Sequence, residues 1–171
     1  MDDSLRELVV TGSTLRSESN PAPPMAPAAA AAALLGGRAA IRRRIETALD
    51  IHDALLEGLP GSALSHLLEH VVELEPEEVL RAVGVSARTV QRRSHRPREA
   101  LSVEQSSRTW KNAELLAKAT VVFGEQVGAE QWLASPAFGL GNRRPIDLLS
   151  TPVGAGLVEQ LLGRIEYGIY S

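Results

Sequence analysis

Apolar residues recur along this chain at the three- and four-residue spacing of an α-helix from about residue 38 to its end. The pattern starts with Ile41 and Ile45 and finishes with Leu161, Ile165 and Ile169. No segment shows the strict alternation of apolar and polar residues that a half-buried strand requires. Because aromatic residues make up only 4% of the chain, Leu, Val, Ile and Ala must build the core. The spacing therefore predicts an all-α fold.

Proline, glycine and composition divide the chain into successive parts. We predict a disordered leader over 1–37, a helical domain over 38–100, a linking helix over 101–124 and a smaller helical domain over 125–171. The leader is biased toward Ser, Pro and Ala, and its prolines between Pro21 and Pro27 exclude a continuous helix. After it, the apolar spacing predicts one unbroken helix from Arg38 to Leu56.

Capping residues mark where two later helices begin. Ser102 and Gln105 are spaced as a capping box, in which each side chain bonds to the backbone of the other residue. Thr151 precedes Pro152, and this pair is typical of an N-cap followed by proline at the first helical position. We expect the first helix to end at Gly124 and the second to continue toward the end of the chain.

Two short helices joined by a tight turn are predicted between residues 76 and 94. Pro76 is well placed to begin the first helix, Gly84 to end it, and Ser86 to cap the second. This spacing is typical of a helix-turn-helix, whose second helix enters the major groove of DNA. Arg and Gln side chains suit paired contacts to guanine and adenine. The candidate DNA-binding residues are Ser86, Arg88, Thr89, Gln91, Arg92 and Arg93.

Charge is segregated around this pair of helices. Residues 79–98 hold six Arg and no acid, whereas residues 69–78 hold five Glu. A net charge of -3 excludes a uniformly basic protein but permits a local phosphate-facing patch. Leu80 lies four residues before Gly84, where close helix crossing usually requires a small residue. Either the two helices are splayed or a neighbouring side chain is reduced; a solvated basic surface without DNA binding is the simpler alternative.

The sequence contains no recognisable set of catalytic residues. The absence of Cys removes disulfides, thiolate metal sites and a Cys nucleophile. His66 and His70 lie four residues apart, but Leu67 stands where a zinc peptidase carries its Glu. The glycines near Gly139 lack the Lys of a phosphate-binding loop. We therefore predict no catalytic residues, no metal site, no cofactor and no enzymatic activity.

Targeting signals are also missing from the expected positions. The acidic start, Met1-Asp2-Asp3, lacks the basic region of a signal peptide. The apolar run 28–35 is too short to cross a bilayer. We expect a cytoplasmic protein without membrane contact.

A set of motifs toward the C-terminus resembles the toxin-binding domain of Xre/MbcA/ParS-type antitoxins. The matching residues are Val122-Phe123-Gly124, Ala129, Trp132-Leu133, Pro136, Leu140-Gly141, Pro145, Asp147-Leu148-Leu149, Thr151, Gly154, Val158, Leu161-Leu162 and Arg164-Ile165-Glu166-Tyr167-Gly168. The resemblance extends through Leu101-Ser102 and Arg88-Thr89 to Gly58-Leu59-Pro60, and so covers residues from about 55 to 171.

The resemblance implies both a fold and a function. The fold would be an Xre-like helix-turn-helix domain joined to a small helical toxin-binding domain. Such antitoxins bind and block a RES-domain toxin, which degrades NAD⁺ or uses it for ADP-ribosylation. They commonly repress their own operon by binding operator DNA, as a homodimer or a larger hetero-oligomer.

Within the implied toxin-binding domain, the last residues are the candidate toxin-binding edge. Tyr is favoured at binding hot spots, and the C-terminal carboxylate of Ser171 could imitate the phosphates of a nucleotide substrate. The candidate residues are Arg164, Glu166, Tyr167, Gly168, Ile169, Tyr170 and Ser171. The alternative is that the apolar residues of this region mostly form the domain's own core, which we expect for Trp132 and Leu161.

Two other functions remain open from the sequence. The chain could be a helix-turn-helix transcription regulator whose C-terminal domain only dimerises. It could also be an adaptor without DNA binding, if the helix pair that contains Leu80 cannot enter a groove.

Overall fold

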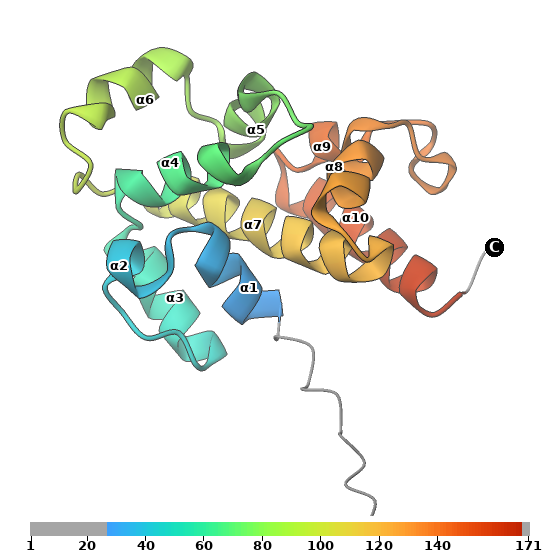
Figure 1. The fold of residues 1–171 in the computed structure, drawn as a ribbon, viewed down its shortest axis with the longest axis horizontal. Coiled ribbons are helices and arrows are strands. Elements are labelled where there is room, and N and C mark those ends of the chain that lie inside the picture. The colour runs from blue at the N-terminus through green and yellow to red at the C-terminus, as the bar shows by residue number, and fades with distance from the viewer. Residues whose placement is uncertain (1–26, 169–171) are drawn as a thin grey trace, which may run out of the picture.

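The computed structural model describes residues 27–168, and this part of the chain is built from helices without a β-sheet (Figure 1). The helices are α1 (Pro27–Leu34), α2 (Gly37–Ile41), α3 (Ala48–Glu57), α4 (Gly61–His70), α5 (Pro76–Val83), α6 (Ala87–Ser94), α7 (Val103–Phe123), α8 (Gln126–Ala134), α9 (Pro145–Leu148) and α10 (Pro152–Glu166), with a 3-10 turn, η1, at Phe138–Leu140. The predicted all-α fold is confirmed.

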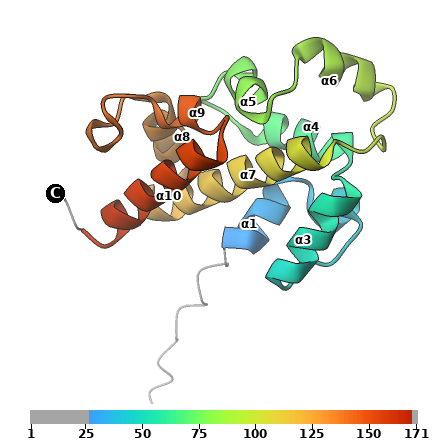
Figure 2. The same ribbon diagram turned by 180° about the vertical axis from the view of Figure 1, so that it is seen from behind.

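The long helix α7 runs through the middle of the molecule and packs against α1, α3, α5, α8 and α10. Helices α1 and α3 lie on one side of it, α4 and α5 on the other, and α8 and α10 toward its C-terminal half (Figure 1, and from behind Figure 2). The predicted capping box starts it, since the Ser102 Oγ accepts a hydrogen bond from the Gln105 N–H at 3.1 Å. Gly124 ends it in the left-handed conformation, as expected.

The prediction of a disordered leader is wrong for residues 27–37, because these residues are folded. They form α1 and the turn into α2, and the side chains of Ala31 and Leu35 are fully buried against the core. Ala is the strongest helix former, and its small side chain lets α1 lie close to α7. The Ala-rich composition therefore serves a helix that packs on the core. The remaining leader residues, 1–26, lie outside the described part of the chain.

The predicted helix from Arg38 to Leu56 is also wrong, because the structure breaks it in two. Helix α2 ends at Arg42, which has a left-handed backbone with a φ of 58°. Helix α3 then starts after Thr47, whose Oγ1 accepts from the Asp50 N–H at 3.2 Å. The hydrogen bonds that Asp50 receives from Thr47 and Glu46 lower the pKa of its carboxyl. This local capping box outcompetes the continuous helix that the apolar spacing indicated.

A buried carboxylate ties the C-terminal helices to the connection between α4 and α5. Glu130, on α8, has no exposed surface. Its Oε2 accepts hydrogen bonds from the backbone N–H groups of Val72, Glu73 and Leu74 at 2.8, 2.6 and 3.1 Å. Its Oε1 accepts one from the Gln126 amide at 2.6 Å. With both oxygens bonded, the buried carboxylate has the hydrogen-bond partners that a charged group inside a protein requires.

An ion-pair cluster provides a second link between the same two regions. Arg144, which directly precedes α9, donates to the Asp147 carboxylate at 2.9 and 2.7 Å and to the Glu78 carboxylate of α5. The hydrogen bond from Arg144 lowers the pKa of Asp147, and the two carboxylates raise the pKa of the guanidinium. Helix α9 is thereby held against α5, one of the two predicted helix-turn-helix elements.

We predict that Glu130→Ala lowers the free energy of unfolding by about 3 kcal/mol, because three backbone N–H groups, that of the buried Leu74 among them, lose a charged acceptor. Urea denaturation followed by circular dichroism measures the change.

The matched control is Glu125→Ala, since Glu125 is exposed and makes no side-chain capping bond at the start of α8. It should change stability by less than about 0.5 kcal/mol. Equal losses for the two variants would contradict the role assigned to Glu130.

Candidate functional site

The turn between α5 and α6 has the predicted geometry. Gly84 ends α5 with a φ of 77°, and its N–H donates to the carbonyl oxygen of Leu80 at 2.9 Å. The Val85 N–H donates to the same oxygen at 3.0 Å, and the Val85 side chain is buried. The Ser86 Oγ accepts from the Thr89 N–H at 3.2 Å and so caps α6. The helix-turn-helix arrangement is therefore present.

Helix α6 stands out from the rest of the molecule (Figure 1). It packs against α4 rather than closely against α5, and its Val90 side chain is half-buried. A pocket of about 260 Å³, lined by residues that include Leu64, Val85 and Val90, lies beneath it. Leu80 is buried, and α6 has its closest contacts with α4. The outer side of α6 is consequently open to solvent.

The predicted DNA-binding residues divide into two groups on α6. Arg88 and Arg92 are exposed and lie one helical turn apart, and neither forms an ion pair within residues 27–168. Gln91 is exposed on the same helix. Ser86 and Thr89 are engaged with one another in the cap, with their hydroxyl oxygens 3.0 Å apart. The remaining candidate, Arg93, has a side chain that lies outside the described residues.

The two flanks of this helix pair carry opposite charge. Glu75 and Glu77, at the start of α5, are exposed, whereas Glu78 is paired with Arg144. Acids in a first turn stabilise the helix through its dipole, but they repel a phosphate backbone. The other flank, beyond the end of α6, carries the exposed residues Arg96 and Arg98. Any polyanion bound by α6 is therefore favoured on that side.

At the other end of the molecule, α10 begins as predicted and is fitted closely to its neighbours. The Thr151 Oγ1 accepts from the Gly154 N–H at 3.1 Å, and Pro152 is the first helical residue. A Cβ on Gly154 would lie 2.1 Å from the Leu148 carbonyl oxygen. The buried side of α10 consists of Gly154, Ala155, Val158 and Leu162. Only a residue without a side chain fits at position 154.

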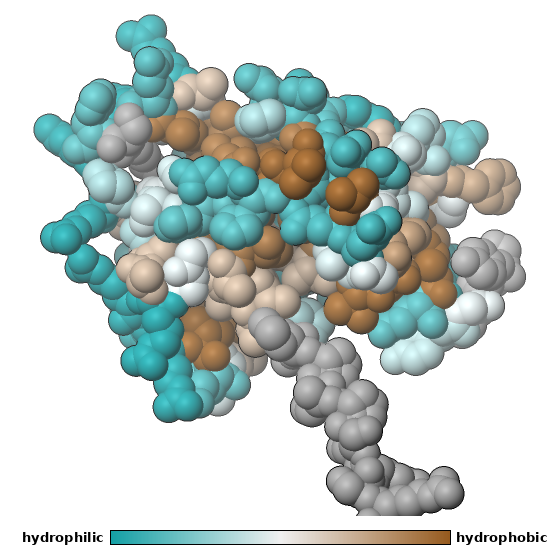
Figure 3. Space-filling view, in the orientation of Figure 1, coloured by the Kyte–Doolittle hydropathy of each residue, from teal (hydrophilic) through white to brown (hydrophobic). Residues whose placement is uncertain are grey.

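Part of the apolar spacing on α10 faces solvent instead of the core. Val153 is 77% exposed and Leu157 is 46% exposed. Trp132 and Leu161 are half-buried and pack against the core, and the Trp132 ring lies 5.4 Å from that of Phe123. The two residues expected in the core thus lie at its edge, packed against its buried members. Apolar surface remains exposed at the end of the molecule where α7 and α10 finish (Figure 3).

The tip of α10 presents four of the predicted toxin-binding residues. Arg164, Glu166, Tyr167 and Gly168 are exposed, and Tyr167 retains 76% of its surface. An open hollow of about 430 Å³ is lined by Gln160, Gly163, Arg164 and Tyr167. The other three predicted residues, Ile169, Tyr170 and Ser171, lie outside the described residues.

Ion pairs fix α10 on α7 and so fix the direction of its tip. The Lys111 ammonium donates to the Glu159 carboxylate at 2.8 Å, and Lys118 lies 3.7 Å from it. The hydrogen bond from Lys111 lowers the pKa of Glu159. With the buried side of the helix packed as well, the tip is presented from a rigid support.

Two residues of interest could not be singled out from the sequence pattern. Phe138, on η1, is 88% exposed, and η1 packs against α10. The second is Glu130, the buried carboxylate that accepts hydrogen bonds from the backbone of residues 72–74. The only signal for Glu130 was a single acid inside the otherwise uncharged helix Gln126–Ala134.

Metal sites and membrane spans are both missing from residues 27–168. No cluster of three or more His, Asp or Glu residues there could hold a metal ion. No helix in that range is both long and apolar enough to span a membrane.

Comparison with known proteins gives matches over both regions. The antitoxin Xre-like helix-turn-helix domain matches residues 50–111, and the antitoxin Xre/MbcA/ParS C-terminal toxin-binding domain matches residues 118–168. Three proteins named antitoxin Xre are similar to this chain. The protein of Pseudomonas putida is 32% identical over 136 residues, which are 74% of this chain and 83% of the relative.

The other two relatives match shorter parts. The protein of Yersinia enterocolitica is 38% identical over 96 residues, which are 55% of this chain and 64% of the relative, slightly less than two thirds of its length. The protein of Photorhabdus laumondii is 31% identical over 118 residues, which are 68% of this chain and 78% of the relative.

We predict opposite effects for two Gly→Ala substitutions in α10. Gly154→Ala should destabilise the protein by about 2 kcal/mol or more, because the new methyl group would meet backbone atoms that cannot move aside. Gly156→Ala should stabilise it by up to about 1 kcal/mol, because a Cβ there meets nothing within 4 Å and Ala is the better helix former. Thermal unfolding measures both, and similar effects of the two substitutions would contradict the packing of α10 on Leu148.

Proposed function

The chain belongs to the Xre/MbcA/ParS-type antitoxins, and from this premise we propose that it neutralises a RES-domain, NAD-consuming toxin and represses its own operon. Family membership rests on the two matched domains and on relatives that align over most of their lengths. Both activities would operate in the cytoplasm, and the protein would act as a homodimer or in a larger complex with the toxin.

The toxin-binding part of the proposal rests on the exposed tip of α10. Tyr167 ends a helix that is packed on α7 and held there by Glu159, so its ring projects from a fixed position. An exposed aromatic side chain beside Arg164 is the kind of anchor that fills a cleft in a partner. We propose that residues 164–171 enter the nucleotide-binding cleft of the toxin and prevent its substrate from binding.

The DNA-binding part rests on the exposed side of α6. Arg88, Gln91 and Arg92 would face base edges in the major groove, and the cap formed by Ser86 and Thr89 would lie near the backbone. The opposite charges of the two flanks support this orientation, because phosphates are repelled from the start of α5.

A second candidate function is a transcription regulator whose C-terminal domain only dimerises. The exposed Val153 and Leu157 favour it, since apolar side chains on one helix face could pair with the same face of a second copy. In that case the protein would bind operator DNA as a dimer, and the product of the neighbouring gene would not bind to it.

We predict that deletion of residues 167–171 abolishes neutralisation of the toxin encoded beside the gene, because the aromatic anchor is removed. Growth of cells that express the toxin together with either form of the antitoxin measures this. Thermal unfolding should change little, since Tyr167 is exposed and ends its helix.

The matched control is Tyr167→Phe, which keeps the ring and should neutralise the toxin like the unaltered protein. Full neutralisation by the shortened chain would rule out the tip as the inhibitory element. Failure of the unaltered protein to co-purify with the neighbouring gene product would favour the second candidate.

We predict that replacing both Arg88 and Arg92 with Ala weakens binding to DNA from the upstream region of the gene, because each arginine would no longer bond to a base edge. The expected reduction in affinity is about tenfold or more for each arginine replaced. A gel shift or fluorescence anisotropy titration measures the change.

Arg143→Ala is the control, because Arg143 is an exposed arginine on the loop before α9. Unchanged affinity and unchanged salt dependence in the double variant would show that α6 is not the recognition helix.

A further inference from the structure

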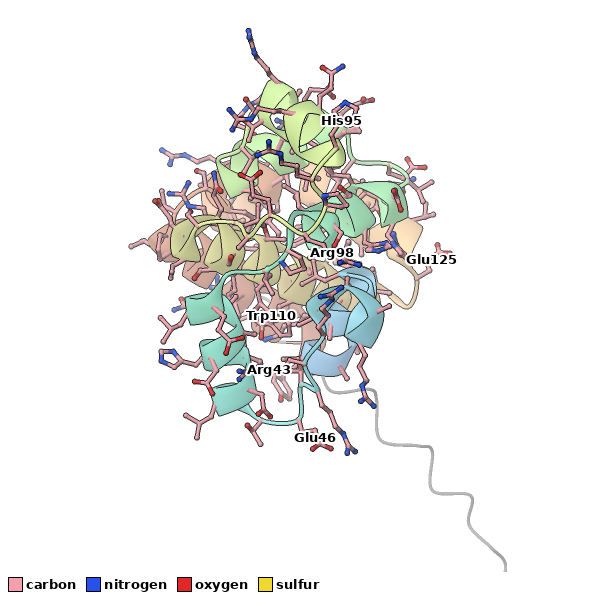
Figure 4. The ribbon with its side chains drawn as sticks, turned by 90° about the vertical axis from the view of Figure 1, so that its left-hand side faces the viewer. Arg43, Glu46, His95, Arg98, Trp110 and Glu125 are labelled. Carbon is pink, nitrogen blue, oxygen red and sulfur yellow. The ribbon has the colours of Figure 1, made fainter. Side chains whose placement is uncertain are left out.

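A second basic surface lies next to α6 but outside the helix-turn-helix. It surrounds a pocket of about 560 Å³ between α2, the start of α4 and the segment that follows α6. Arg42 and Arg98 line this pocket, together with the polar side chains of Ser62 and His66. In Figure 4, Arg98 lies between His95, just beyond the end of α6, and Arg43, in the loop after α2. The pocket thus continues the basic flank of α6 across this side of the molecule.

The backbone around Arg98 is held in place by the start of α4. The Gly61 N–H donates to the Glu99 carbonyl oxygen at 2.9 Å, and the Ser62 N–H donates to that of Pro97 at 3.0 Å. These bonds satisfy the first amides of α4, which have no partner inside their own helix. Arg98 therefore sits between two anchored carbonyl groups, and its guanidinium is presented at the edge of the pocket.

Arg42 occupies its position at a conformational cost. Its φ of 58° lies in the left-handed region, which a glycine adopts far more readily at the end of a helix. A charged side chain kept where the backbone favours glycine points to a role for the charge, because such strain tends to be retained at functional positions.

The charge in the pocket is available for an anion. Neither Arg42 nor Arg98 forms an ion pair or a side-chain hydrogen bond with another residue of the described chain. Glu57 is the single acid among the lining residues, and it is paired with Arg43. Two arginines without an acidic partner in a concave surface suit an oxygen anion, since the guanidinium matches phosphate geometry.

We propose that Arg42 and Arg98 bind the phosphate backbone of the DNA whose bases α6 contacts. This inference rests on the proposed DNA binding and extends its footprint from α6, through the exposed Arg96, to the loop after α2. The opposite flank cannot serve in the same way, because Glu75 and Glu77 are exposed there. The two arginines position the protein on the duplex and carry no base preference.

The test uses Arg42→Gly and Arg98→Ala, singly and combined, in the full chain. Each variant is titrated with a duplex from the upstream region of the gene and with a scrambled duplex of equal length, at several salt concentrations. The combined variant should lower the slope of log affinity against log salt by about 2, one for each phosphate contact. The loss should be equal for both duplexes, so that their affinity ratio is unchanged.

The choice of glycine at position 42 distinguishes an effect on protein stability from an effect on DNA affinity. Arg42→Gly should keep or raise the melting temperature, because glycine relieves the left-handed backbone, while it weakens binding to both duplexes. Arg143→Ala, which also removes one exposed positive charge, should leave the salt slope as it is.

Three results would overturn the proposal. An unchanged salt slope in the combined variant, with binding still abolished on replacing Arg88 and Arg92, would refute the phosphate contacts and leave the proposed recognition helix intact. A changed affinity ratio would mean that Arg42 or Arg98 contacts bases instead of phosphates. No binding of either duplex by the unaltered protein would refute this proposal together with the DNA-binding half of the proposed function.

Discussion

The burial of α7 over most of its circumference is the constraint on which the rest of this structure depends. Trp110, Ala113, Leu115, Leu116 and Ala119 are all buried, and they point to different sides of the helix. Helices from before and after α7 in the sequence must therefore cover it together. Since the two matched family domains both include residues of α7, neither has a core that is complete without this helix. The two matched domains therefore share one hydrophobic core.

The two candidate binding surfaces lie at separate places around this shared core. Helix α6 projects near the N-terminal half of α7, and the tip of α10 projects near its C-terminal half (Figures 1 and 2). The exposed residues Arg88 and Tyr167 thus lie on separate surfaces. A toxin on the tip of α10 and DNA on α6 need not compete for the same residues, which suits a protein proposed to do both.

Local signals in the sequence predicted most helix boundaries. Gly84, Ser102 and Thr151 act through their own backbone or the next few residues, so their effects could be predicted without knowledge of the fold. The Ala-rich helix α1 could not be predicted in this way, because a biased composition folds only when a partner such as α7 accepts it. The left-handed turn at Arg42 has no local signal at all, since arginine rarely adopts that conformation.

The candidate sites were predictable to different degrees for the same reason. The exposed arginines of α6 follow from helix spacing, whereas the pocket at Arg42 and Arg98 joins residues far apart in the chain. On α10, the apolar spacing did not distinguish the buried Val158 from the exposed Leu157, because the packing partners decide which side faces the core.

The hydrogen bonds of Glu130 affect which substitutions the connection between α4 and α5 can accept. Its three partners between positions 72 and 74 are main-chain amides, and the side chains of Val72 and Glu73 are exposed. Any non-proline residue at these positions supplies the same N–H group. The hydrogen bonds to Glu130 thus do not depend on which side chains stand at positions 72 and 73, whereas Leu74 is buried in the core and contributes its side chain as well. Substitutions at positions 72 and 73 other than proline should therefore leave this link between the two regions in place.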